Sequence, residues 1–163
     1  MNNIFKKEKG FTLLEMLITI LIISVGVLGT YTSVFKYSKN TQKEKEAFIA
    51  TYLCQEGVEI IKNMRDSNWV AEEEDWNNGL TNIICATGCE IDYLGNTLTA
   101  YSAADFLYIN PDGTYRYEAS GVKTPWTRRI IIDSSDATKL AITVSVYWGS
   151  NTKTIKETIY NWK

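Results

Sequence analysis

The sequence predicts an α+β protein in which one long amino-terminal helix packs on an antiparallel β-sheet head. Three observations support this prediction. A single charge, Glu15, interrupts the apolar run from Phe11 to Phe35, and an amphipathic pattern without proline continues to Arg65. Beyond residue 66, alternating apolar and polar residues between polar turns are typical of a sheet with one buried face. The predicted parts are a basic leader (1–10), an apolar transmembrane or assembly helix (11–35), the amphipathic second half of that helix (36–66) and a β-rich globular head (67–163).

Composition limits the function classes. The chain has 163 residues, a net charge of -2 and a pI near 5.3, so it lacks a broad basic surface and nucleic acid is not expected as a partner. It contains no histidine, which removes the usual general base and the commonest metal ligand. No nucleophile elbow, phosphate-binding loop or pair of catalytic carboxylates is present. We therefore expect no enzyme activity, no cofactor and no metal site.

The apolar segment is long enough to span a bilayer, which requires about 20 residues. Three interpretations compete. The segment could be a secretory signal peptide, although Ser24-Val25-Gly26 is a poor cleavage site and the apolar character continues past it. It could be a permanent single-span anchor. It could also be retained whole after a cut that follows Gly10 and removes only the lysine-rich leader.

Glu15 favours the third interpretation. A carboxylate costs roughly 2.5–3.5 kcal/mol at the centre of a spanning helix, and such residues are usually functional. Cleavage after Gly10 would create an α-amine on Phe11 with an ordinary pKa of about 7.7–8.0, largely cationic at neutral pH. Phe11 and Glu15 are four residues apart and share a helix face, and the helix dipole favours an anion in the first turn. The amine of a packed neighbour would serve the carboxylate equally well, so Glu15 is a candidate docking signal between subunits.

The stretch KGFTLLEMLITILII closely resembles the cleavage and methylation segment of type IV prepilins and of the related pseudopilins of type II secretion. The resemblance implies that a prepilin peptidase cuts after Gly10 on the cytoplasmic face and methylates the new amine of Phe11. It also implies that Glu15 pairs with that amine on an adjacent subunit. The expected partners are other pilin subunits, the peptidase and the inner membrane. Before assembly, the chain is expected to cross the inner membrane once, with its head outside the cytoplasm. After assembly, it is expected to lie in a cell-surface filament.

The amphipathic half predicts that the helix continues to Arg65, roughly 80 Å from Phe11 at 1.5 Å per residue. The predicted apolar stripe consists of Ile49, Leu53, Ile60 and Met64. The residues that flank it are Ala50, Cys54, Gly57 and Ile61. The helix is expected to stop in RDSNW, Arg65 to Trp69, because Asp, Ser and Asn favour local backbone hydrogen bonds.

The head is predicted to contain short strands, one hairpin and a meander. Residues 81–85 and 90–94 are the short strand candidates, and 106–119 form a hairpin that turns at Asn110–Gly113. Three longer strands are expected at 127–133, 140–148 and 154–162. Polar turns join them, so an antiparallel meander should place one face on the helix stripe. The same helix-on-sheet arrangement is implied by the pilin resemblance.

The three cysteines allow at most one intramolecular disulfide. Cys85 and Cys89 flank Ala-Thr-Gly and would pair if the head lies in an oxidising compartment. The alternative is two free thiols in a loop. Cys54 is expected to be a small packed side chain on the helix.

Three further groups of residues are candidate binding sites with simpler explanations. Asp92, Asp105 and Asp112 could offer oxygen ligands to calcium, but there is no D-x-D-x-D-G loop and turn chemistry accounts for Asp112. The acidic run 72–75 is expected to be a solvated loop. A carbohydrate platform is one interpretation of the tryptophans, and a place in the core or an interface is the favoured one. The tryptophans are Trp69, Trp76, Trp126, Trp148 and Trp162.

The expected function is that of a structural subunit of a type IV pilus-like filament. The stretch YLCQEGVEIIKNMRDSNW resembles PilV-like minor pilins more than a major pilin. The alternatives are a type II secretion pseudopilin and a permanently anchored binding module whose aromatic-rich head contacts sugar or protein. A competence-type filament that grips DNA is disfavoured, because loss of the leader removes three lysines and one glutamate and leaves a net charge of -4.

Overall fold

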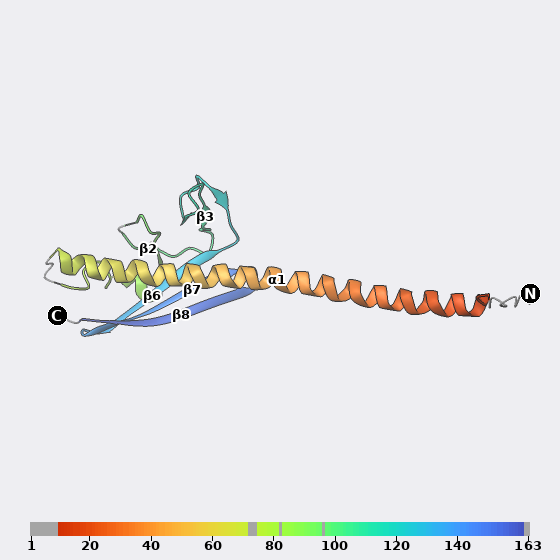
Figure 1. Ribbon diagram of the computed structural model, residues 1–163. Helices are drawn as coiled ribbons and strands as arrows, with labels where there is room; N and C mark the ends of the chain where they lie inside the picture. The colour runs from red at the N-terminus through yellow and green to blue at the C-terminus, as the bar shows by residue number, and fades with distance from the viewer. Residues whose placement is uncertain (1–9, 72–74, 82, 96, 162–163) are drawn as a thin grey trace, which may run out of the picture. The chain divides into compact units, whose positions relative to one another are not determined.

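The computed structural model describes residues 10–71, 75–81, 83–95 and 97–161, and it has the predicted α+β fold (Figure 1). Helix α1 runs from Leu13 to Val70 and the short helix α2 from Ile83 to Thr87. By internal contacts the chain divides into two compact units, the first ending at Glu44 and the second beginning at Lys45. The core and both sheets belong to the second unit.

The predicted stop of the long helix at 65–69 is wrong, because α1 continues to Val70. Residues that favour helix ends are used instead for side-chain contacts. Arg65 forms an ion pair with Asp66 at 2.7 Å. The Asn68 amide donates hydrogen bonds to the carbonyl oxygens of Trp76 and Asn78 at 3.0 and 2.9 Å. Since these contacts engage the polar side chains away from their own backbone, they no longer compete with the helical hydrogen bonds.

The main sheet has the strand order β2-β1-β6-β7-β8 and is antiparallel. Its three long members confirm the predicted meander: β6 (Thr127–Asp136), β7 (Lys139–Trp148) and β8 (Asn151–Tyr160). Their register places Ile130, Val144 and Ile155 side by side on one face. The two-residue strands β1 (Cys89–Glu90) and β2 (Thr99–Ala100) extend the sheet beyond β6.

A second, smaller sheet has the strand order β4-β3-β5. Strands β3 (Tyr108–Ile109) and β4 (Tyr115–Arg116) form the predicted hairpin. Its turn is closed by a 2.9 Å hydrogen bond from the Gly113 amide to the Asn110 carbonyl, and Gly113 has the positive φ of 83° that glycine tolerates. Strand β5 (Val122–Lys123) pairs with the other edge of β3 and was not anticipated from the sequence.

Two strand predictions are wrong. Residues 83–85 of the predicted strand 81–85 belong to helix α2 instead, after which the Gly88 amide donates a hydrogen bond to the Ile84 carbonyl at 3.0 Å. Residue 82 lies outside the described residues. A short apolar run cannot be assigned to helix or strand by periodicity alone. The segment 90–94 leaves the sheet after Glu90, because the Asp92 carboxylate accepts hydrogen bonds from the amides of Leu94 and Gly95 and turns the chain.

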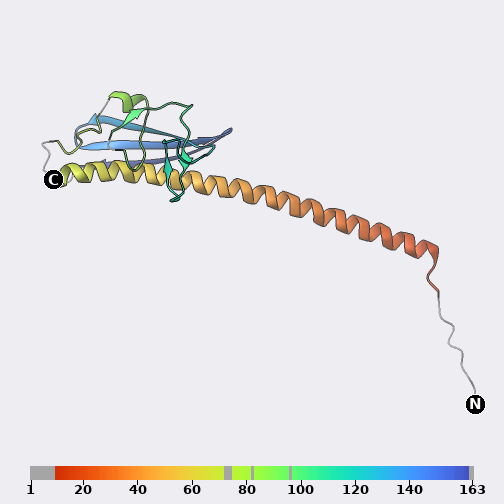
Figure 2. The same cartoon turned by 90° about the horizontal axis from the view of Figure 1, so that it is seen from above.

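The main sheet lies along the part of α1 that begins at Lys45 (Figure 2). The buried face of α1 is rotated relative to the predicted stripe, since Ile49, Ile60 and Met64 are only partly buried. The buried residues of α1 are Ala50, Leu53, Cys54, Gly57, Val58 and Ile61. Gly57 is one of the contact points on this face. A Cβ atom there would lie 2.9 Å from Val144 Cγ1, so the helix and the sheet approach each other closely at this glycine.

Arg128 on β6 is fully buried between α1 and the sheet. Its guanidinium donates to the carbonyl oxygens of Leu53 at 3.2 Å and Ile91 at 2.6 Å, and lies 3.5 Å from the Glu56 carboxylate. Tyr117 donates from its hydroxyl to the Arg128 carbonyl at 3.1 Å. One side chain thus connects the helix, the segment after β1 and the central sheet.

Candidate processing and assembly site

The Gly10–Phe11 bond lies in non-helical backbone just before α1. Gly10 is exposed, and no atom of the described residues lies within 4 Å of the position a Cβ would take. Phe11 is 73% exposed. A protease must bind the scissile bond in an accessible, non-helical conformation, and this bond has both properties.

Thr12 caps the start of α1, a role that our sequence analysis missed. Its Oγ1 accepts a hydrogen bond from the Glu15 amide at 3.3 Å. A threonine followed three residues later by glutamate is the capping-box spacing, so this pattern was available in the sequence. The cap fixes the helix start between the scissile bond and Glu15.

Glu15 lies in the first turn of α1 and its side chain is exposed. Within the part of the chain that the structure describes, its carboxylate has no hydrogen-bond or ion-pair partner, since its recorded bonds involve only backbone atoms. Phe11 precedes it by four residues, about one helical turn. The carboxylate is therefore available to an amine at this end of the helix.

The apolar part of α1 is long and apolar enough to cross a membrane, and it is the one helix among the described residues that is. None of its most apolar stretch is buried, which distinguishes it from the core helix of a soluble protein. Its hydroxyl groups bond back to the helix: Thr19 donates to the Glu15 carbonyl and Ser24 to the Ile20 carbonyl, both at 2.7 Å. These groups need no water, so they suit a lipid or a packed filament core.

In the head, Cys85 and Cys89 form a disulfide with a Cα–Cα distance of 4.7 Å, and both residues are fully buried. The bridge joins α2 to β1 inside the core. Cys54 is a buried free thiol that donates to the Lys153 carbonyl at 3.4 Å. Burial raises the pKa of this thiol, which keeps it protonated.

Two of the three aspartates considered for calcium have structural roles. Asp112 accepts hydrogen bonds from the amide and hydroxyl of Thr114 and pairs with Arg116. Asp92 holds the turn described above, and Asp105 is exposed. Among the described residues, no three potential metal ligands come together.

Most of the tryptophans belong to the head core rather than to a binding platform. Trp76, Trp126 and Trp148 are at most 9% exposed, and Trp69 packs against the same core. Trp162 and most of the acidic run 72–75 lie outside the described residues.

Residues 5–31 match the family model described as the prokaryotic N-terminal methylation motif. No curated protein and no solved structure matches the chain significantly. The matched segment contains Gly10, Phe11, the Thr12 cap and Glu15, and its most apolar part forms the exposed stretch of α1. The comparisons do not separate PilV-like minor pilins from other branches. This motif, together with a long helix followed by an antiparallel sheet head, supports the similarity of the chain to type IV pilins and pseudopilins.

Proposed function

We propose that the chain is a prepilin that is cleaved after Gly10, methylated on the amine of Phe11 by a prepilin peptidase, and assembled as a minor subunit of a type IV pilus-like filament. A subunit of a type II secretion pseudopilus is the alternative within the family. The observation that carries the proposal is the carboxylate of Glu15, which has no partner among the described residues. It lies in the first turn of an exposed apolar helix that begins just after an accessible Gly10–Phe11 bond.

Cleavage changes the electrostatics of this end of the helix. Before it, Glu15 is an anion in an apolar segment and costs free energy on transfer from water. After it, Phe11 carries a cation at neutral pH one turn away. N-methylation keeps a basic amine, so the charge persists in the mature chain.

The partner of Glu15 is expected to be the amine of a neighbouring subunit. Apolar side chains surround α1 on all sides from Leu13 to Phe35, as the exposed fractions of 50–78% for its large residues show. Packing of several such helices would cover these side chains and exclude water from the charge pair. An ion pair is strengthened when water is excluded, provided that both charges are present.

The proposed location before assembly is the inner membrane, crossed once, with the head outside the cytoplasm. The Cys85–Cys89 disulfide supports this orientation, because disulfides persist in oxidising compartments. The proposed role is structural, and the prepilin peptidase acts on this chain.

Mass spectrometry of the amino terminus tests the proposal. The chain purified from membranes or filaments should begin at a methylated Phe11. A chain that keeps its leader and still polymerises normally would refute the proposal, and an intact terminus without polymerisation would favour the permanently anchored binding module.

Replacement of Glu15 separates assembly from insertion. Glu15→Gln should leave membrane insertion intact and lower incorporation into filaments by about tenfold, the equivalent of a lost interaction of about 1.4 kcal/mol. Glu44→Gln is the matched control, because Glu44 is an exposed carboxylate on the same helix beyond the apolar segment. Equal incorporation of both variants would contradict the charge-pairing role of Glu15.

A further inference from the structure

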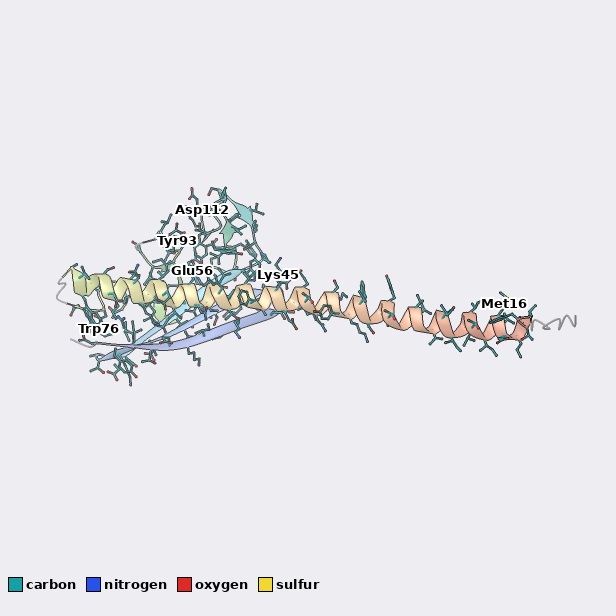
Figure 3. All side chains as sticks on the ribbon, viewed as in Figure 1. Met16, Lys45, Glu56, Trp76, Tyr93 and Asp112 are labelled. Carbon is teal, nitrogen blue, oxygen red and sulfur yellow. A yellow bond between two sulfur atoms is a disulfide. The ribbon has the colours of Figure 1, made fainter. Side chains whose placement is uncertain are left out.

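The head has a groove of about 830 Å³ beside the last turns of α1. One wall is α1 from Glu56 to Asn68, and the other consists of the loops at Asn78–Gly79 and Tyr93–Gly95. Figure 3 shows Glu56 and Tyr93 on the same side of the helix. The floor also contains the apolar side chains of Ile60 and Met64. The groove is therefore large enough for several side chains of a partner.

The groove carries excess negative charge. The charged side chains that line it are the carboxylates of Glu56, Glu59 and Asp66 and the ammonium of Lys62. The Lys62 ammonium forms ion pairs with both Glu59, at 3.3 Å, and Glu157, at 3.6 Å. A cation is the kind of ligand that this lining favours.

Glu56 is the least compensated of the three carboxylates. Its side chain is 19% exposed, and its ion pair with Arg128 is long at 3.5 Å. Burial raises the pKa of Glu56, the Arg128 charge opposes that shift, and Asp92 adds to it. A second cation at this carboxylate would offset its loss of hydration.

A basic stripe lies elsewhere on the same helix. Lys36, Lys39 and Lys43 are all exposed and are spaced by three and then four residues. This spacing places them on one helix face. Lys45 is nine residues from Lys36 and points about 180° away from that face.

The groove side of α1 repeats this spacing 20 residues further along, at Glu56, Glu59 and Asn63. Twenty residues of helix correspond to about 30 Å. If two copies of α1 run parallel with that displacement, Lys36 of one copy lies level with Glu56 of the other, and Lys39 lies level with Glu59. The third lysine of the stripe meets an amide rather than another cation.

We propose that the groove receives the basic stripe of a second copy of this chain, displaced by about 30 Å along the helix axis. This inference rests on the proposed filament function. The ammonium groups of Lys36 and Lys39 reach the carboxylates of Glu56 and Glu59, and their aliphatic stems lie against Ile60 and Met64.

The contact is specific to the assembled state. The hydrocarbon core of a bilayer is about 30 Å thick, so two copies inserted at the same depth have no comparable displacement. Only a copy that has left the bilayer can bring its lysines level with the groove of a copy below it. Subunits stored in the membrane would not make the contact.

Disulfide trapping tests the register. Two tagged copies, one with Lys39→Cys and the other with Glu59→Cys, are produced together in cells that assemble the filament. The native cysteines do not interfere, because Cys54 is buried and Cys85 is bonded to Cys89. The mixed disulfide should form about tenfold faster in filaments than for a control pair of Lys45→Cys with Glu59→Cys, because proximity raises the effective thiol concentration. Membrane-stored copies should show no such difference.

Trapping at the control rate in filaments that begin with a methylated Phe11 would overturn the groove inference and leave the filament function standing. An unprocessed, unassembled chain would overturn both.

Charge reversal gives an independent readout. Glu59→Lys and Lys39→Glu should each lower incorporation of the chain, and a mixture of the two variants should restore it. Glu118→Lys, which adds the same charge at an exposed position outside the groove, should have no effect. Loss with Glu59→Lys that Lys39→Glu does not restore would overturn the second copy as occupant and indicate a different basic subunit.

Discussion

Gly57 sets the distance between α1 and the sheet, and Gly57→Ala tests this directly. The added Cβ would lie 2.9 Å from Val144 Cγ1, 3.2 Å from Arg128 Cδ and 3.5 Å from Val144 Cγ2. Val144 and Arg128 are fully buried, so neither side chain can move into solvent. The helix must move away from the sheet, or the core must deform.

Two opposing effects determine the size of the change. Alanine stabilises a helix interior by about 1 kcal/mol relative to glycine. Overpacking of a well-packed core costs about 1–3 kcal/mol. The net result is a decrease in the free energy of unfolding of the head by about 0–2 kcal/mol. In a Val144→Ala background the methyl groups that collide are gone, and Gly57→Ala should then stabilise the head by about 1 kcal/mol.

The measurement is urea unfolding of the full chain in detergent micelles, followed by the fluorescence of the buried Trp76, Trp126 and Trp148. A double-mutant cycle isolates the interaction, because Val144→Ala costs roughly 2 kcal/mol with glycine at position 57 and should cost about 1–3 kcal/mol less with alanine there. The predicted coupling between positions 57 and 144 is about 1–3 kcal/mol. If Gly57→Ala stabilises the wild-type head by the same amount as it stabilises the Val144→Ala head, the close-approach argument is wrong.

Three further perturbations have defined outcomes. Burial raises the pKa of Glu90 from its ordinary value of 4.5 to about 7, with Asp105 adding to the shift, so the folded head binds more protons than the unfolded chain between these values. Stability should therefore fall as pH rises from about 4.5 to about 7, by at most about 3 kcal/mol, and Glu90→Gln should remove that slope in urea titrations. Arg128→Met should cost about 3–5 kcal/mol, because the partly buried Glu56 and the carbonyls of Leu53 and Ile91 lose their partner, and adding Glu56→Gln should recover part of this loss. Replacing Cys85 and Cys89 by alanine should lower the free energy of unfolding by roughly 2 kcal/mol, the chain-entropy value for so short a loop, and an unchanged urea midpoint would show that the bridge adds nothing.

The predictions that succeeded depend on local pattern. The apolar run, the alternating residues of β7 and the Asn-Pro-Asp-Gly turn each contain their own signal within a few residues. The failures depend on partners far along the chain. The helix continues past Arg65 because Asn68 bonds carbonyls eight and ten residues later, and α2 is a helix where an apolar run was ambiguous.

The candidate site divides in the same way. Gly10, Phe11 and Glu15 were identified from their spacing, and the Thr12 cap could have been, since its pattern lies within the same four residues. The acidic groove could not be identified from the sequence, because it is lined by α1 and by loops near Asn78 and Tyr93 that come together only in the folded head.

The amino-acid order by itself determined that this chain has an apolar helix with one carboxylate near its start, followed by a β-rich head, because hydrophobic period and charge spacing are properties of neighbouring residues. The tertiary structure alone decided which face of α1 is buried and that Arg128 is enclosed. Arg128 takes its hydrogen-bond partners from 75 and 37 residues away. Burial of a cation costs too much free energy unless such partners surround it, and no local sequence pattern predicts that these distant residues come together.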